Sequence, residues 1–163
     1  MRKTTKRRRW VANPNAINIA LNNVSMVRDA GSANTLMRLV GHEAMDSLRR
    51  GEGTRGHLQS IIEAANIAET LARLHNLGTD WLPEIHEAQA CIHALAARSA
   101  QIGRYTLKAN ELKALNLLLE IHDAQLDACS VQTLGKAVEY IRQRMARKDV
   151  IVLPAVKEQA CHA

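Results

Sequence analysis

The chain is organised around two consecutive segments, DWLPEIHEAQACIHALAARSAQIG at positions 80–103 and RYTLKANELKALNLLLEIHDAQLDA at positions 104–128. Apolar residues recur at three- and four-residue spacing in both segments, which is the pattern of an amphipathic helix. Asp80 and Pro83 are typical of a first helical turn, and Gly103 is typical of a helix end. The sequence therefore predicts two long helices joined at a glycine.

The two segments share a hexapeptide, EIHEAQ at 84–89 and EIHDAQ at 120–125. The similarity does not extend beyond these six positions, so it does not predict a repeat architecture. Two interpretations stay open. Either the similarity arises by chance together with the shared requirements of two amphipathic helices, or His86 and His122 face each other in a polar layer.

The same spacing predicts helices on both sides of this pair. The expected helices are 34–49, 55–77, 82–102, 107–128 and 131–148, preceded by a shorter helix at 16–28. The apolar stripe of the first long helix is predicted at Leu36, Val40, Ala44 and Leu48, and that of the last at Leu134, Val138, Ile141 and Met145. His42 and Asp46 are four residues apart, which indicates an ordinary surface pair on one helix.

These elements predict an all-α fold, an up-and-down bundle of four to five helices with a flexible basic N-terminal arm. The expected boundaries are 1–12 for the arm, 13–148 for the bundle and 149–163 for an extended tail. A chain of 163 residues is long enough to bury a core without disulfides or a structural metal. Phenylalanine is absent, so we expect a core of Leu, Ile, Val, Met and Ala.

Net charge is the most informative property of the composition. The formal charge is +6, from 22 Lys and Arg and 16 Asp and Glu. Residues 1–10 contain six basic residues and no acidic one, so the rest of the chain has 16 of each sign. The basic residues are Arg2, Lys3, Lys6, Arg7, Arg8 and Arg9. The sequence thus predicts a neutral domain that carries a cationic arm.

Three interpretations of the arm are open. It binds nucleic acid through phosphates, it binds an acidic protein surface, or it only keeps the chain in solution. Trp10 directly follows the basic run, and an aromatic ring at this position is suited to stacking on a base. We therefore predict that Arg2, Lys3, Lys6, Arg7, Arg8, Arg9 and Trp10 contact nucleic acid.

Other residue patterns argue against a metal, a cofactor or catalysis. Cys91, Cys129 and Cys161 are far apart and form no C-x-x-C, so neither a disulfide framework nor a zinc site is predicted. No histidine follows a glutamate at three-residue spacing, and no H-E-x-x-H occurs. The glycines of GEGTRG at 51–56 lack the lysine of a phosphate-binding loop, and no G-x-S-x-G is present. We expect a protein that is not an enzyme and needs no metal or cofactor.

The sequence also indicates no membrane partner. No apolar run approaches the roughly 18 residues of a membrane span, and asparagines interrupt the region that a secretory signal would need.

Several short segments are similar to those of a group of bacteriophage proteins. They are NIAETLA at 66–72, AQA at 88–90, IGRYTL at 102–107 and ELKAL at 111–115, with a basic run before Asn13-Pro14. From Lys6 to about Met145 the chain resembles small uncharacterised α-helical proteins of bacteriophages and prophages. This resemblance implies a phage-encoded accessory protein in the bacterial cytoplasm, and it implies no particular catalytic or binding residue.

Together these observations predict a non-enzymatic accessory protein that associates with nucleic acid through its basic arm. The alternative is a protein-interaction module, whose helical surface binds a host or phage protein and inhibits a host system. Homo-oligomer formation is compatible with either interpretation, because small aliphatic helices often pair.

Overall fold

The computed structural model describes residues 26–29 and 31–150. In order, the described elements are η1 (Val27–Asp29), α2 (Ser32–Arg49), α3 (Arg55–His75), η2 (Thr79–Trp81), α4 (Leu82–Ile102), α5 (Ala109–Ala128) and α6 (Val131–Ala146). The prediction of an all-α bundle of four to five helices is confirmed. The predicted basic arm, most of the predicted helix 16–28 and the tail after Val150 lie outside the described residues.

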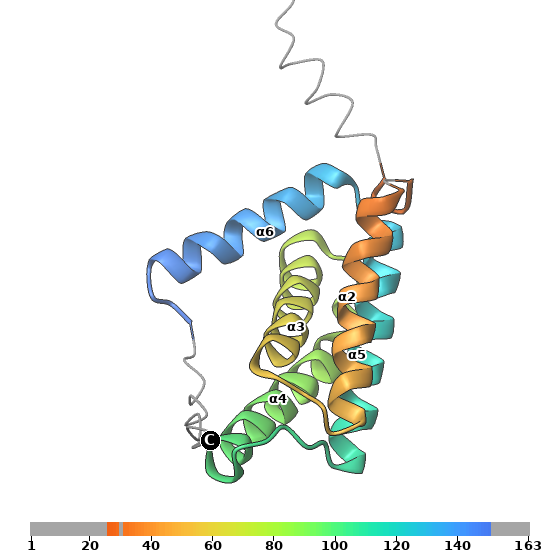
Figure 1. The fold of residues 1–163 in the computed structure, drawn as a ribbon. Helices are drawn as coiled ribbons and strands as arrows, with labels where there is room; N and C mark the ends of the chain where they lie inside the picture. The colour runs from red at the N-terminus through yellow and green to blue at the C-terminus, as the bar shows by residue number, and fades with distance from the viewer. Residues whose placement is uncertain (1–25, 30, 151–163) are drawn as a thin grey trace, which may run out of the picture.

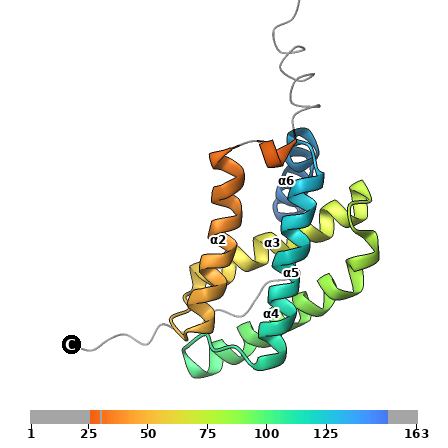
Figure 2. The ribbon, with the colours of Figure 1, turned by 90° about the vertical axis from the view of Figure 1, so that its right-hand side faces the viewer.

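The direction of the chain alternates from α2 to α5 (Figure 1). The helices α2 and α5 lie side by side, and the antiparallel pair of α3 and α4 crosses them (Figure 2). The last helix, α6, packs against α3 and lies across the end of the bundle where η1 also lies. Among the described residues of α6, Ala137 is buried and the others are half-buried or exposed.

Side-chain caps start two of the helices at the predicted positions. The Thr54 hydroxyl accepts a hydrogen bond from the His57 amide at 3.3 Å and begins α3. The Ser130 hydroxyl accepts one from the Thr133 amide at 3.1 Å and begins α6. Each cap satisfies a backbone donor that has no partner inside its own helix.

Left-handed residues end two of the helices. Gly103 has a φ of +75° and ends α4, as predicted. The end of α3 differs from the prediction, because Asn76 takes the left-handed conformation at φ 55° and stops the helix at His75 instead of residue 77. Asparagine tolerates this conformation better than most residues, since its short side chain bonds locally.

The core is aliphatic, as the composition predicts. Its largest completely buried side chains come from α2, α3, α4 and α5, and they are Leu48, Ile61, Leu71, Ile85, Leu95, Leu115, Leu118, Leu119 and Leu126. A smaller cluster under α6 contains Val27, Leu71, Leu126, Cys129 and Ala137. Branched and small side chains of this kind allow close approach of helices.

The predicted apolar stripe of α2 is only half correct. Ala44 and Leu48 are buried, but Leu36 and Val40 are 60% and 40% exposed. A strict four-residue spacing turns through about 400°, so the stripe drifts by about 40° at each step. The buried face of the first half of α2 instead carries Asn34, and beside it Arg38 donates to the Asp123 carbonyl and to the Asp127 carboxylate of α5.

A buried ion pair joins α4 to α5. Arg98 of α4 donates two hydrogen bonds to the Glu111 carboxylate, at 2.7 and 2.6 Å, and a third to the Thr106 carbonyl at 2.6 Å. The Lys108 amide donates to the same carboxylate at 2.8 Å. Burial by itself raises the pKa of Glu111, but the hydrogen bonds from Arg98 and Lys108 outweigh it, so the pKa lies below its ordinary value. The loop after α4 is thereby fixed at both ends.

A buried amide joins α5 to the end of α3. Gln125 is 4% exposed, and its Nε2 donates to the carbonyls of Ala68 and Leu77 at 3.0 and 2.8 Å. Leu77 lies beyond the end of α3, so the second bond satisfies a carbonyl that has no partner within that helix, and the first bond adds a contact to the helix itself.

Candidate functional site

The predicted nucleic-acid-binding residues, Arg2, Lys3, Lys6, Arg7, Arg8, Arg9 and Trp10, lie outside the described residues. The first residues that the structure describes are Met26 and Val27. Met26 forms an antiparallel bridge with Ser130, and the Val27 amide donates to the Cys129 carbonyl at 3.0 Å. Val27 is 2% exposed. The described chain therefore begins beside the turn between α5 and α6.

Many of the cations of the bundle are paired with carboxylates. The arginines in such pairs are Arg38, Arg49, Arg50, Arg73, Arg98, Arg142 and Arg144. Among the described residues, Arg147 and Lys148 extend the basic end of α6 with no such pair, next to Asp149.

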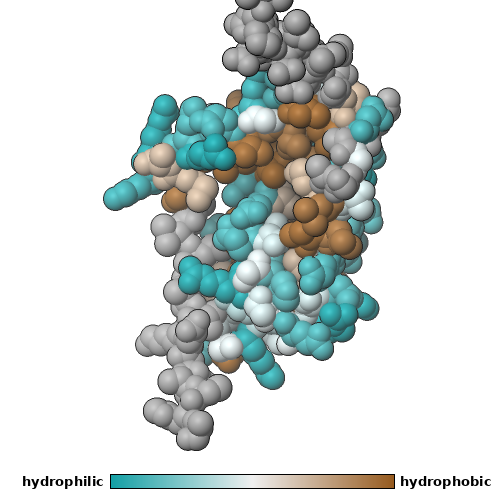
Figure 3. Space-filling model, turned by 45° about the horizontal axis from the view of Figure 1, so that its top comes forward, coloured by the Kyte–Doolittle hydropathy of each residue, from teal (hydrophilic) through white to brown (hydrophobic). Residues whose placement is uncertain are grey.

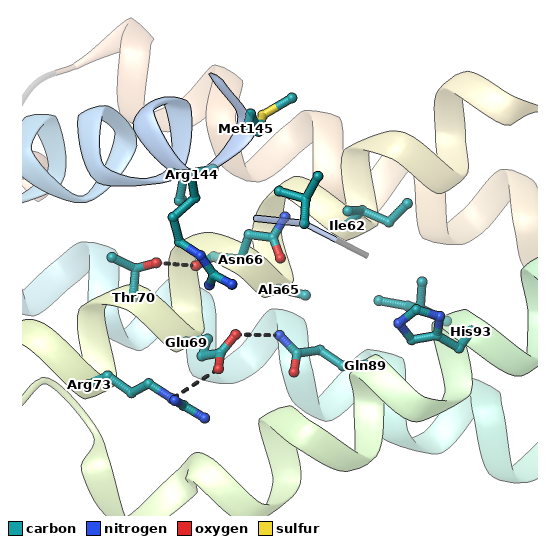
Figure 4. A pocket seen from close by; sticks show the side chains of 13 residues that line it. Ile62, Ala65, Asn66, Glu69, Thr70, Arg73, Gln89, His93, Arg144 and Met145 are labelled. Carbon is teal, nitrogen blue, oxygen red and sulfur yellow. Dashed lines mark hydrogen bonds and ion pairs between the residues drawn. The ribbon is translucent and has the colours of Figure 1, made fainter. Parts of the chain in front are cut away.

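One cleft in the described surface lies between α3, α4 and α6 and has a volume of about 370 Å³ (Figure 4). We call it the polar cleft. Its floor is made by Asn66, Glu69 and Thr70 of α3 and by Gln89 of α4, and Arg144 reaches into it from α6.

Glu69 is the centre of this floor. Its carboxylate accepts from Arg73 Nε at 2.9 Å and from Gln89 Nε2 at 2.8 Å, and it lies 3.4 Å from His86 Nε2. Arg73 Nη2 is in turn 3.0 Å from His86 Nε2. A carboxylate with these neighbours is held in one orientation, which suits recognition of a ligand by shape and hydrogen bonds.

Arg144 connects the polar cleft to the end of α6. Its Nε donates to Asp149 Oδ2 at 3.0 Å, and this bond raises the pKa of the guanidinium above its ordinary value. In Figure 4 its side chain points from α6 toward Asn66 and Thr70 of α3. The end of α6 forms one wall of the polar cleft. The side chain of Arg144 links this wall to Asp149, which follows the helix.

A second cleft lies on the adjacent side of α6 and has a volume of about 660 Å³. We call it the apolar cleft. Its apolar wall consists of Leu58, Ile62, Ile67, Tyr105, Val138, Ile141, Met145 and Val150, and its charged residues are Arg55, Glu63 and Arg142. Both clefts include Ile62, Asn66, Ile141, Met145 and Val150. They are thus two parts of one depression beneath the second half of α6.

A third candidate is the outer face of α2. Leu36, Leu39 and Val40 follow i, i+3, i+4 spacing, so they share one face, and they are 60%, 60% and 40% exposed. Figure 3 shows apolar residues gathered on the upper part of the molecule with hydrophilic residues around them. Exposed apolar groups of this kind often mark an interaction surface.

The histidines do not converge. His122 is 4% exposed and its Nδ1 lies 3.7 Å from Asp123 Oδ1, whereas His86 is exposed beside Glu69. The two hexapeptide histidines therefore have different neighbours and form no shared polar layer. Among residues 26–29 and 31–150, no three His, Cys, Asp or Glu side chains are grouped so that they could hold a metal ion.

The predicted surface pair of His42 and Asp46 is wrong. His42 Nε2 lies 2.8 Å from Asp123 Oδ2 of α5, and Asp46 instead pairs with Arg49 and Arg50. Burial raises the pKa of Asp123, but hydrogen bonds from His122 and His42 outweigh it and lower that pKa. Sequence spacing missed this contact, because it shows only neighbours on the same helix.

The two described cysteines have thiols whose pKa is raised. Burial raises the pKa of Cys91, and the nearby carboxylates of Glu111 and Glu87 raise it further. Burial also raises the pKa of Cys129, which is 1% exposed. A raised pKa reduces the thiolate fraction near neutral pH, as expected for structural cysteines.

None of the described helices combines the length and the apolar character needed to cross a membrane. Comparisons of the chain with protein-family models, with curated proteins and with solved structures give no significant match. The sequence showed no signal for either cleft, because their walls come from helices that are distant in the chain.

Proposed function

We propose that this chain is a non-enzymatic accessory protein of a phage or prophage that associates with nucleic acid in the bacterial cytoplasm through Arg2, Lys3, Lys6, Arg7, Arg8, Arg9 and Trp10. The observation that carries the proposal is the charge distribution. All six units of net positive charge lie in residues 1–10, while the rest of the chain is neutral. Phosphate binding depends on such clusters of Lys and Arg.

The pairing of cations in the bundle supports this assignment. Arginines that are already bonded to carboxylates contribute little to binding phosphates, because a phosphate must compete with the existing partner. Met26 is anchored to the bundle by its bridge with Ser130, and residues 11–25 separate it in the sequence from the basic run. At roughly 3.3–3.6 Å per extended residue, Arg9 lies at most roughly 60 Å and Arg2 at most roughly 85 Å from that anchor.

The test is fluorescence polarisation with a random duplex and a random single strand, from about 50 to 300 mM salt. If six cations neutralise duplex phosphates, log K falls with log salt at a slope of roughly −5. Changing Arg7, Arg8 and Arg9 to Gln removes three contacts, so we expect a slope of roughly −2 to −3. The matched control changes the exposed Lys136, Arg147 and Lys148 to Gln and leaves the slope unchanged.

Single-strand binding tests Trp10 separately. Trp10→Ala removes base stacking and weakens single-strand binding by roughly 1–3 kcal/mol, with little effect on duplex binding. A flat salt response of the full chain contradicts the proposal, as does an equal loss in the control variant. Equally tight binding to polyglutamate would favour an acidic protein partner.

A second candidate function is a protein-interaction module, and the exposed Leu36, Leu39 and Val40 on α2 favour it. Its partner would be a host or phage protein, and blocking a host system is one consequence. Affinity capture from bacterial lysate separates the two functions. A partner retained after deletion of residues 1–10 and lost after Leu36→Asp and Leu39→Asp supports this module. Loss on deletion of the arm alone supports the nucleic-acid function.

A further inference from the structure

A pocket between η2 and α5 is the strongest structural feature that the proposed function does not use. It has a volume of about 270 Å³. We call it the Trp81 pocket, because Trp81 lines it and is 47% exposed. Its apolar wall consists of Leu77, Leu117, Ile121, Ala124 and Ala128. A large aromatic side chain that stays open to solvent beside an apolar wall is typical of a binding site.

Hydrogen bonds hold the wall on the side of η2 in place. The Thr79 hydroxyl donates to the Ala72 carbonyl of α3 at 3.1 Å. From the other side, Gln125 Nε2 of α5 donates to the Leu77 carbonyl at 2.8 Å. The turn that carries Trp81 is thus tied to both helices. A ligand therefore meets a formed pocket, and binding orders few further groups.

The polar groups of the Trp81 pocket favour a positive charge. Among the described residues that line it, Glu120 is the one charged residue, and it is exposed. Gln125 donates both hydrogens of Nε2 to the carbonyls of Ala68 and Leu77, so this amide can only accept further bonds. Its Oε1 is buried and has no hydrogen-bond partner among the described residues, which adds partial negative charge to the wall. The face of an indole ring also attracts cations.

We propose that the Trp81 pocket binds a small organic amine in its protonated form. The apolar body of the amine lies against Leu117 and Ile121, and its ammonium group lies near Glu120 and Trp81. The ammonium group donates hydrogen bonds and forms an ion pair with the carboxylate, while the apolar body is removed from water. A neutral ligand would gain only the apolar contacts, and an anionic ligand would be repelled by Glu120. Preference for a positive charge therefore distinguishes this site from a simple apolar pocket.

The probe is phenethylamine, which is protonated at neutral pH, and its neutral and anionic counterparts are phenethyl alcohol and hydrocinnamate. In the full chain with Trp10→Phe, Trp81 is the remaining tryptophan, so fluorescence reports on the pocket. We expect a saturable change with a Kd of roughly 0.1–1 mM for the amine. The alcohol should bind about three to ten times more weakly, because it lacks the ion pair and the cation–π contact. Hydrocinnamate should bind more weakly still.

Glu120→Gln tests the source of the charge preference. It removes the carboxylate at an exposed position, so the preference for the amine over the alcohol should fall about two- to fivefold, with alcohol binding unchanged. The matched control, Glu43→Gln at an exposed position of α2, should leave the preference unchanged. Trp81→Leu removes the ring, and amide chemical shifts of Leu77 and Ala124 should then show weaker binding of the amine.

Four outcomes would overturn the proposal. They are equal binding of the amine and the alcohol, tighter binding of hydrocinnamate, no saturable change up to about 10 mM amine, and a preference for the amine that survives Glu120→Gln. The last result would place the charged group at another site. If Trp81→Leu fails to fold, Glu120→Gln with the three probes still decides the question, because this exposed carboxylate lies outside the core.

Discussion

At the scale of single residues, the ionic contacts of the bundle differ in how much they stabilise the fold, because some are buried and others are exposed to water. Asp46 lies at the surface between Arg49 and Arg50, where water screens the charges. Glu111 is 2% exposed and has three hydrogen-bond donors, two from Arg98 and one from Lys108. Of these two, only the buried contact between Glu111 and Arg98 fixes the relative position of two helices.

Replacing Glu111 with Gln should therefore destabilise the protein. The variant leaves the guanidinium of Arg98 without its anion in a largely buried site, which costs about 2–3 kcal/mol of unfolding free energy. Arg98 is 21% exposed, which keeps the cost below that of a completely buried pair. Urea unfolding measures the effect. Glu120→Gln, at an exposed position on the same helix, serves as the control and should change stability by less than about 0.5 kcal/mol.

A second variant checks the cause of the Glu111 effect. Arg98→Met combined with Glu111→Leu removes both charges and retains apolar volume, so it should recover part of the loss, while the Thr106 carbonyl and the Lys108 amide lose their side-chain partners. If the double variant is as unstable as Glu111→Gln, the pair does not act through an uncompensated charge, and the explanation is wrong.

At the scale of elements, glycine has opposite roles in α6 and in the loop before α3. Gly135 lies inside α6, and a Cβ added there meets nothing within 4 Å. Gly53 lies in the loop and bridges to Tyr105, and a Cβ there would lie 2.5 Å from Leu48 Cδ2 and 3.0 Å from Tyr105 Cβ. Leu48 is 1% exposed, so a shift of its side chain would disturb its neighbours in the core.

We therefore expect two opposite results from one type of substitution. Gly135→Ala should stabilise the protein by about 0.5–1 kcal/mol, because alanine loses less conformational entropy in a helix. Gly53→Ala should destabilise it by about 1–3 kcal/mol through overpacking. Urea midpoints of both variants measure the difference. Destabilisation by Gly135→Ala would show that α6 packs more closely there than described.

At the scale of the whole molecule, the carboxylates predict the response to acid. Glu111 and Asp123 both have a pKa below their ordinary values of 4.5 and 3.8. A group whose pKa is lower in the folded state contributes stability above its unfolded pKa, and this contribution is lost as pH falls through the folded pKa. The protein should therefore keep its stability from pH 7 to about 5 and lose it below about 4.

Thermal unfolding between pH 3 and 7 tests this expectation. The variant with Glu111→Gln and Asp123→Asn should be less stable at pH 7 and should show a flatter decline in acid, because its lost carboxylates no longer take up protons on unfolding. A decline as steep as that of the unchanged protein would assign the acid response to other groups.

The helices of this protein were predictable because their signals are local. Thr54, Gly103 and Ser130 act on backbone groups a few residues away, and the aliphatic composition determines the kind of core. The helix ends that differ, such as the stop at Asn76, differ by one or two residues, as local preferences compete closely there.

The sequence by itself determined the approximate bounds of the five described α-helices and the cationic character of residues 1–10, but not the two 3-10 helices η1 and η2. Only the tertiary structure decided which side chains meet. His42 contacts Asp123, which is 81 positions away in the sequence, and Arg98 contacts Glu111. The two clefts form where α6 crosses α3. The physical reason is that helix periodicity reports which residues share a face, whereas the partner of that face depends on how whole helices cross and pack.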